Sequence, residues 1–254
     1  MHLSFSGTLL KQFEDPGVRQ TFGETVNIGE FLDRYRRSNI EFVGSGLYHP
    51  VYPLSPPADW DAQTEWWLGL GRHLFGRERF DGFWPPEMGF CMEMIPMLKR
   101  HGYKYVLVDS IFIKPKREMR WDEISEYLRR FPQTEEVEVH RGAWNTEHHW
   151  GGDFTQWTGS LLQKKGWDEL RRASEYYWQS KKRFDQQLAA LENPDEIRHL
   201  ITRAYDHLLT AETSCNFYWG SRWVHRSFDD LEQAYYLLDV AKEKMAKAGE
   251  PLNR

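Results

Sequence analysis

The first half of the chain alternates short apolar runs with stretches whose apolar residues recur at helical spacing. The apolar runs predict four β-strands, at residues 3–6, 40–44, 80–84 and 105–109. The periodic stretches predict helices at residues 28–38, 59–75 and 91–100. Strands that alternate with helices are typical of a parallel sheet or barrel, in which functional side chains gather at the carboxyl ends of the strands.

The second half is predicted to be mostly helical. A fifth, weak strand is predicted at residues 137–139, before a loop rich in glycine, histidine and tryptophan. Three helices follow: one at residues 167–191, one after the start signal Asn-Pro-Asp-Glu at 193–196, and one that opens with Ser227 and Asp230. The predicted parts are therefore an α/β region at residues 1–115, a connecting segment at 116–150 and a helical domain at 151–254.

Charge and composition narrow the class of protein. The net charge of −5, with both signs mixed, argues against a nucleic-acid partner bound through its phosphates. No apolar stretch is long enough to span a bilayer, and the first residues lack the basic and apolar regions of a signal peptide. We therefore expect a cytoplasmic protein without a membrane partner. Its two cysteines, Cys91 and Cys215, are expected to be free thiols, with Cys215 buried beside Trp219.

The chain is unusually aromatic. It contains 12 Trp, 12 Tyr and 15 Phe, which is 15% of its residues. Exposed indoles stack on the apolar face of sugar rings, whereas buried indoles simply fill a core. Composition alone leaves both interpretations open and favours the core.

One turn places a carboxylate beside an indole at the end of the third predicted strand. Residues 83–90 read Phe-Trp-Pro-Pro-Glu-Met-Gly-Phe, and consecutive prolines hold a turn because they fix φ and remove backbone donors. Glu87 is therefore a candidate for acid/base or nucleophilic chemistry on a glycoside. The alternative is that Glu87 caps the following helix.

Two more candidate groups follow neighbouring strands. His49 follows the second strand in the run Gly-Leu-Tyr-His-Pro at 46–50, and Asp109 ends the fourth. In a parallel sheet these side chains and Glu87 share one edge. His49 could instead be a hydrogen-bonded turn residue, and Asp109 a structural acid at a strand end.

Several separated motifs resemble glycoside hydrolase family 57, which includes α-amylase-like enzymes, 4-α-glucanotransferases and α-glucan branching enzymes. The motifs are residues 46–50, 82–90, 103–109, 141–146 and 211–220. The resemblance implies an incomplete (β/α)₇ barrel followed by a C-terminal helical domain. It also implies a retaining mechanism on α-glucans or maltooligosaccharides without a cofactor, with Glu87 as nucleophile. We expect Tyr48, His49, Trp84 and Trp219 to bind the substrate.

The chain also departs from the family pattern. The first strand of the family, with its His-x-Pro motif, has no counterpart, and neither has the segment that carries the general-acid aspartate. A retaining glycosidase needs two carboxylates about 5 Å apart. Asp109 is a weak candidate for the second, and Glu147 and Asp153 are further ones.

Two other functions remain open. The chain could be a catalytically degenerate relative that binds α-glucan or supports a partner, with Trp84, Trp150, Trp219 and Trp223 as sugar platforms. It could also be a metal-dependent hydrolase built on residues 147–149 (Glu-His-His) with His140 or His49, although this spacing is not that of a known metal motif, and we predict no metal.

Because four or five strands cannot close a barrel, we expect an open sheet whose edge is covered by helices or by a partner chain.

Overall fold

The computed structural model describes residues 2–109, 128–130, 132, 139–144, 154–188, 191 and 194–248. The chain divides into two compact units. We call Met1–Pro53 with Trp60–Thr155 the sheet unit, and Leu54–Asp59 with Gln156–Arg254 the helical unit. The predicted three-part division stays a prediction, because most of residues 116–150 lies outside the described residues.

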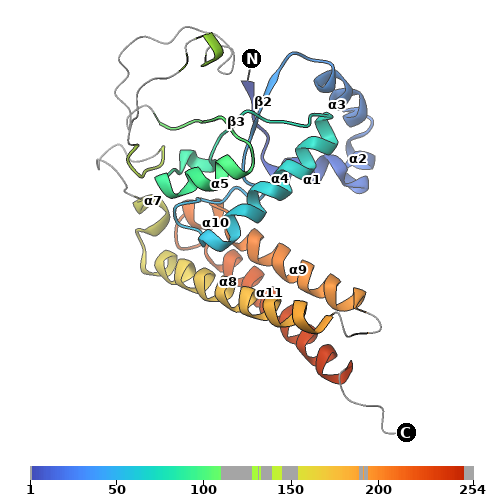
Figure 1. Ribbon diagram of the computed structural model, residues 1–254, viewed down its shortest axis with the longest axis vertical. Helices are drawn as coiled ribbons and strands as arrows, with labels where there is room; N and C mark the ends of the chain where they lie inside the picture. The colour runs from blue at the N-terminus through green and yellow to red at the C-terminus, as the bar shows by residue number, and fades with distance from the viewer. Residues whose placement is uncertain are drawn as a thin grey trace. The chain divides into compact units, whose positions relative to one another are not determined.

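The sheet unit contains an open parallel sheet of four strands in the order β1-β2-β3-β4 (Figure 1). The strands are β1 (His2–Leu3), β2 (Glu41–Gly44), β3 (Gly82–Phe83) and β4 (Tyr105–Val106). Hydrogen bonds extend the ladder past these bounds, from Trp84 N to Gly44 O at 2.8 Å and from Leu107 N to Phe83 O at 2.9 Å. The predicted α/β class with an open parallel sheet and a helical part is therefore confirmed, and the loops after β2, β3 and β4 share one edge.

Glycines allow tyrosines to pack across this sheet. A Cβ atom on Gly44 would lie 2.1 Å from Tyr103 Oη, and one on Gly82 would lie 2.3 Å from Tyr105 Cζ. Tyr105 Oη then reaches past β3 and donates to Glu41 Oε1 at 2.6 Å. Any side chain at Gly82 would displace the ring that links β4 to β2.

The N-terminal segment differs from the prediction. Only His2–Leu3 is a strand, because the Ser6 hydroxyl accepts a hydrogen bond from Leu9 N and starts a helix instead. The pattern missed two helices here, α1 (Gly7–Glu14) and α2 (Pro16–Phe22), the second of which is capped by Asp15. Both are short, with eight residues in α1 and seven in α2.

The helices predicted at 28–38, 59–75 and 91–100 are present with changed bounds, as α3 (Ile28–Arg36), α4 (Trp60–Phe75), and η3 (Met92–Met94) followed by α5 (Ile95–Arg100). Two short 3₁₀ helices were not predicted: η1 (Pro57–Asp59), which belongs to the helical unit, and η2 (Pro86–Met88). The helix predicted at 91–100 is thus split, with a proline in the first turn of α5. Helix α4 packs against β2, α1 and α3 (Figure 1), and Phe75 of α4 stacks on Phe42 of β2 at 4.3 Å.

Besides η1, the helical unit contains α7 (Thr155–Thr158, whose first residue belongs to the sheet unit), α8 (Leu161–Leu188), α9 (Asp195–Ala211), α10 (Cys215–Tyr218) and α11 (His225–Ala248). Helices α8, α9 and α11 pack side by side (Figure 1). Helix α11 begins before the predicted Ser227, which is fully buried in its first turn. At one end of the unit, Phe217 stacks on Trp167 with ring centroids 4.0 Å apart.

The prediction that Cys215 is buried beside Trp219 is wrong. Cys215 is exposed, because the short helix α10 turns Asn216 and Phe217 inward and leaves its first residue outside. Cys91 is buried, and this burial raises the pKa of its thiol to about 12. Cys91 is therefore a protonated packing residue at neutral pH and not a nucleophile.

A buried carboxyl group anchors residues 54–59 within the helical unit. Asp59 is fully buried, and its Oδ1 accepts hydrogen bonds from Trp178 Nε1 at 2.8 Å and from Tyr205 Oη at 3.0 Å. Ser174 and the buried Glu212 lie beside the Asp59 carboxyl group and lower its pKa in part. Burial raises the pKa of Asp59, and the hydrogen bonds offset only part of this effect.

The raised pKa predicts how stability changes with pH. The folded protein keeps the Asp59 proton to a higher pH than the unfolded chain, whose Asp pKa is about 3.9. The contribution of Asp59 to the free energy of unfolding is therefore fully present below the unfolded-state pKa and is lost as pH rises toward the folded-state pKa. Asp59→Asn cannot ionise at this position, so it avoids this loss. We therefore expect the Tm of Asp59→Asn minus that of wild type to increase from pH 4 to pH 9.

The measurement is thermal unfolding followed by circular dichroism across this pH range. The exposed Asp229→Asn on α11 is the matched control and should follow wild type. Parallel Tm–pH curves for Asp59→Asn and wild type would contradict the account.

Candidate functional site

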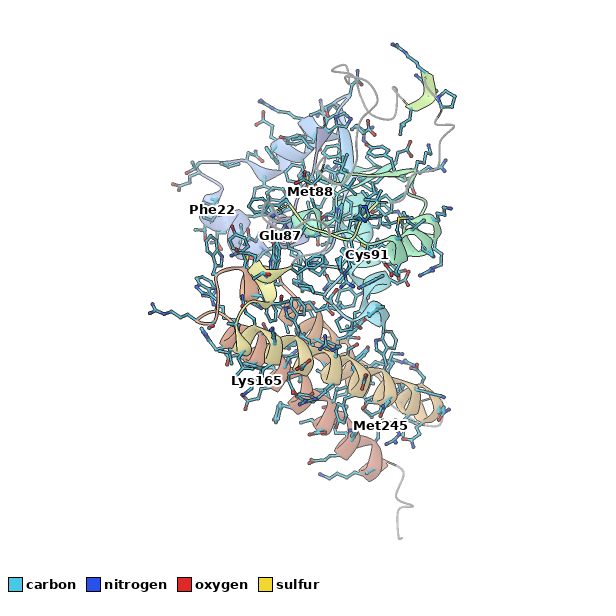
Figure 2. The ribbon with its side chains drawn as sticks, turned by 90° about the vertical axis from the view of Figure 1, so that its left-hand side faces the viewer. Phe22, Glu87, Met88, Cys91, Lys165 and Met245 are labelled. Atoms are coloured by element: carbon cyan, nitrogen blue, oxygen red, sulfur yellow. The ribbon has the colours of Figure 1, made fainter. Side chains whose placement is uncertain are left out.

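Glu87 lies in a sharply bent turn directly after β3. Its φ and ψ are 59° and 17°, and the following Met88 has a φ of 49°. Both residues are labelled in Figure 2. A left-handed conformation is uncommon for residues other than glycine. The two prolines before Glu87 fix φ at their own positions and so limit the backbone conformations that lead into this turn. The first residues of η3 and α5 receive no side-chain cap, so Glu87 does not serve as the helix cap considered above.

His49 faces Glu87 from the loop after β2. His49 Nδ1 lies 3.5 Å from Glu87 Oε1, and His49 itself has a φ of 57°. Among the described residues, the non-glycine positions with positive φ are His49, Glu87 and Met88. Strained backbone concentrates at functional sites when the surrounding structure holds it in place. Here all the strain of this kind gathers around one carboxylate.

The segment at 139–144 reaches the same turn from far along the chain. Phe90 and Gly142 form an antiparallel bridge, with Phe90 N to Gly142 O at 2.9 Å and the reverse bond at 3.1 Å. Trp144 N donates to Glu87 O at 2.9 Å, and the Trp144 indole N–H donates to Glu87 Oε2. Glu87 is therefore bound through both its backbone and its side chain.

The electrostatics keep the imidazole neutral. Burial lowers the pKa of His49, and the nearby Glu87 carboxylate offsets only part of this effect. A neutral imidazole and an indole can surround the Glu87 carboxylate without forming a strong ion pair. The side chain of Glu87 is 12% exposed, so the carboxylate is sheltered but reachable.

A buried glutamine positions the loop that carries His49. Gln63 of α4 accepts from Leu47 N through its backbone oxygen at 2.9 Å and from Tyr48 N through Oε1 at 3.0 Å. Neither Gln63 nor Trp144 was singled out from the sequence as a partner of the site. Trp144 does belong to one of the motifs that carry the resemblance, whereas a polar residue on the buried face of a predicted helix is the only signal for Gln63.

The structure brings together some of the predicted substrate-binding residues. Trp84 contacts His49 edge-on with ring centroids 6.4 Å apart, and its buried Nε1 has no hydrogen-bond partner among the described residues. Tyr48 is buried, and its hydroxyl accepts a hydrogen bond from Lys11. Trp219 belongs to the helical unit, where it is 60% exposed.

Asp109 lies two residues beyond the last ladder hydrogen bond of β4, at Leu107, and is half-buried. It therefore follows the strand next to the one that leads to Glu87. Glu147, Trp150 and Asp153 lie outside the described residues, as do His148 and His149 of the alternative metal site. Within the part of the chain that the structure describes, no group of three metal-ligating side chains occurs.

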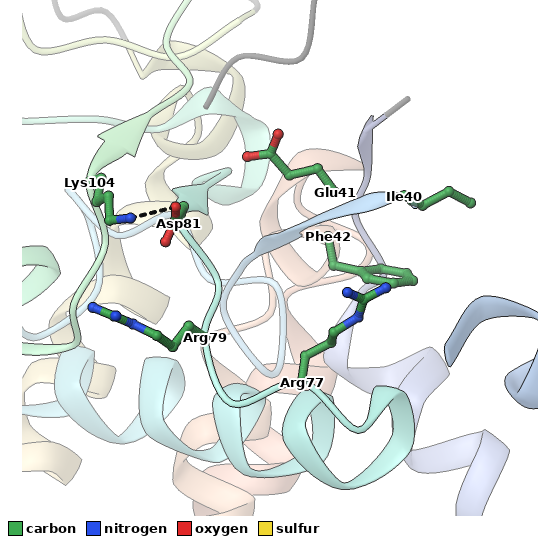
Figure 3. A pocket seen from close by; sticks show the side chains of 7 residues that line it. All are labelled: Ile40, Glu41, Phe42, Arg77, Arg79, Asp81 and Lys104. Carbon is green, nitrogen blue, oxygen red and sulfur yellow. Dashed lines mark hydrogen bonds and ion pairs between the residues drawn. The ribbon is translucent and has the colours of Figure 1, made fainter. Parts of the chain in front are cut away.

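A separate pocket of about 360 Å³ lies at the amino ends of the strands (Figure 3). It is lined by Ile40, Glu41, Phe42, Arg77, Arg79, Asp81 and Lys104. Its carboxylates are already engaged, since Lys104 Nζ lies 2.6 Å from Asp81 and Glu41 binds Tyr105 and His2. Figure 3 shows Arg77 and Arg79 pointing in different directions. This pocket is at the opposite strand ends from Glu87, and its charges do not converge on one ligand.

Comparison with known proteins identifies the family. The profile described as Glycosyl hydrolase family 57 matches residues 1–181. The chain belongs to glycosyl hydrolase family 57. No curated protein matched the chain. No helix among the described residues is both long and apolar enough to cross a membrane.

Two solved structures share the fold. A GH57-type branching enzyme from the hyperthermophilic archaeon Pyrococcus horikoshii aligns with a TM-score of 0.65 and 12% identity, over 96% of this chain and 84% of that one. A 4-alpha-glucanotransferase from Thermococcus litoralis aligns with a TM-score of 0.54 and 15% identity, over 92% of this chain and 51% of that one. The chain thus spans about half the length of the glucanotransferase.

The role of Gln63 in holding the site can be tested by stability. Gln63→Met keeps the side-chain length but leaves the buried Tyr48 N–H without its acceptor, which costs about 1–3 kcal/mol. We expect the free energy of unfolding of the sheet unit to fall by this amount in urea titrations. The exposed Gln12→Met on α1 is the control. Equal stability of Gln63→Met and Gln12→Met would show that this hydrogen bond does not hold the loop.

Proposed function

We propose that this protein acts on α-glucans as a glycoside hydrolase or glucanotransferase by a retaining mechanism, with Glu87 as the nucleophile. One observation carries the proposal: in a chain of family 57, a carboxylate is fixed in a strained turn at the carboxyl edge of a parallel sheet. The branching-enzyme and glucanotransferase structures that share its fold support α-glucan as the substrate class. The family and the site together favour glycoside chemistry over an unrelated hydrolase.

The surroundings of Glu87 suit a nucleophile. A nucleophilic carboxylate must be ionised and must approach the anomeric carbon without first breaking a strong ion pair. The lowered pKa of His49 keeps the imidazole neutral, so His49 contacts Oε1 without a full opposing charge. Attack of Glu87 would form a glycosyl-enzyme ester, which water or a second sugar then releases with overall retention.

Two tryptophans, one in each unit, would each contact glucan in this proposal. Trp84 presents a buried indole N–H that lacks a partner among the described residues, and a sugar hydroxyl would satisfy it. Trp219 offers an exposed ring of the kind that stacks on pyranose faces. Tyr48 would act mainly by shaping the His49 loop, because its ring is buried.

Substitution of the nucleophile tests the proposal. Glu87→Gln keeps the shape of the side chain but cannot form the glycosyl-enzyme, so release of reducing ends or transfer products from amylose should fall by more than about 10³-fold. The matched control is Glu93→Gln, an exposed acid in the same segment, which should retain activity. Wild-type activity in Glu87→Gln would overturn the proposal.

Asp109 is proposed as the acid/base residue. Loss of a general acid slows departure of a sugar leaving group by about 10²- to 10⁴-fold but spares fluoride, which leaves without a proton. We therefore expect Asp109→Asn to lose activity on maltooligosaccharides while keeping most of its pre-steady-state rate of fluoride release from α-maltosyl fluoride, because only the later release of the glycosyl-enzyme needs the residue as a base. Equal losses on both substrates, or none on either, would assign the proton transfer to another residue.

A degenerate, glucan-binding relative is the second candidate function. The exposed rings of Trp144 and Trp219 favour it, because they can hold a sugar without any catalysis. It predicts that maltooligosaccharide changes tryptophan fluorescence equally in wild type and Glu87→Gln, while neither protein turns the sugar over. Turnover by wild type alone would reject this candidate.

A further inference from the structure

Trp144 makes two separate hydrogen bonds to Glu87. Its backbone N–H binds the Glu87 carbonyl oxygen at 2.9 Å, and its indole N–H binds the carboxylate oxygen Oε2. The neighbouring bridge between Phe90 and Gly142 fixes the segment against the turn, and Arg141 donates to the carbonyl oxygen of Pro53. Trp144 is thus anchored by its backbone independently of what its side chain does.

The two oxygens of the Glu87 carboxylate have different environments. Oε2 accepts the indole hydrogen bond, whereas Oε1 is 3.5 Å from His49 Nδ1, beyond the distance of a good hydrogen bond. Hydrogen bonds to ionised groups are among the stronger ones in proteins. The indole hydrogen bond therefore holds Oε2 in place, and Oε1 is the oxygen that faces His49.

We propose that Trp144 is a positioning residue for Glu87, which holds Oε2 so that Oε1 attacks the anomeric carbon. This inference rests on the function proposed above. In the first step the bond from Oε1 to the anomeric carbon forms while the bond from that carbon to the leaving group breaks. Oε2 becomes the carbonyl oxygen of the ester and still accepts the indole hydrogen bond. With a glycosyl fluoride the leaving group departs as fluoride ion, so this step needs no proton donor.

The indole ring of Trp144 could also stack on a bound sugar, and this effect must be separated from its hydrogen bond to Glu87. Trp144 is 42% exposed beside the carboxylate, so its ring face can also stack on a bound sugar. Trp144→Phe keeps an aromatic face and the backbone hydrogen bond but removes the indole N–H. Loss of stacking would mainly raise KM, whereas loss of positioning would lower kcat.

The experiment measures kcat and KM on α-maltosyl fluoride for wild type, Trp144→Phe, Glu87→Gln and the control Tyr236→Phe. Tyr236 is an exposed aromatic residue on α11. We expect Trp144→Phe to lower kcat by about 10- to 100-fold, as for the loss of one hydrogen bond to a charged group, with KM changed less than about 3-fold. Tyr236→Phe should match wild type. An unchanged kcat in Trp144→Phe, or an effect on KM alone, would overturn the positioning role.

The controls separate this inference from the proposed function. If Glu87→Gln is inactive and Trp144→Phe is fully active, only the positioning role is wrong. If Glu87→Gln keeps the wild-type rate, or wild type shows no turnover, the proposed function is wrong and the catalytic role of Trp144 falls with it.

Indole ¹H–¹⁵N NMR spectra test the contact without activity. The resonance that disappears in Trp144→Phe should move in Glu87→Gln, because its acceptor changes from a carboxylate to an amide. A resonance that stays in place would overturn the hydrogen bond itself.

Discussion

The site depends on the contacts that hold the Glu87 residue in place. Glu87 sits in a left-handed turn that ordinary residues avoid, and it stays there because its backbone oxygen binds Trp144 N and its carboxylate contacts Trp144 and His49. These contacts come from two loops, one that carries His49 and one that carries Trp144. The strain of the turn is therefore offset by structure that is assembled only when the whole sheet unit folds.

The sheet supplies the common edge that these loops need. Parallel pairing of β2, β3 and β4 places the loops that carry His49, Glu87 and Asp109 at the same strand ends. The glycines at 44 and 82 permit tyrosines from the β4 region to lie flat across the neighbouring strands. Gln63 then fixes the His49 loop from α4. The packing of the tyrosines on the strands and the hydrogen bonds of Gln63 thus both support the loops that carry His49 and Glu87.

The hydrophobic pattern was sufficient to predict much of the fold. Where a prediction was wrong, a local hydrogen bond or a short helix explains the difference. Strands at 40–44 and 80–84 are apolar and bounded by turn residues, so their place was predictable. The run at 3–6 looked like a strand, but the Ser6 hydroxyl binds Leu9 N and starts a helix. Cys215 looked like a buried thiol because its neighbours are aromatic, yet a four-residue helix leaves it outside.

The candidate site was predictable only in part. Proline spacing and strand order placed Glu87, His49 and Asp109 near one edge, whereas the contact of Trp144 with Glu87 joins residues that are 57 positions apart. The left-handed φ of Glu87 was also hidden, since no glycine or asparagine marks it.

The most direct measurement is the mass of the protein after reaction with a 5-fluoro-α-glucosyl fluoride, which slows release of a glycosyl-enzyme. The account predicts the added mass of one fluorosugar, located on Glu87 by peptide mapping. Labelling of another residue would contradict it, and so would complete turnover of the reagent without any covalent adduct.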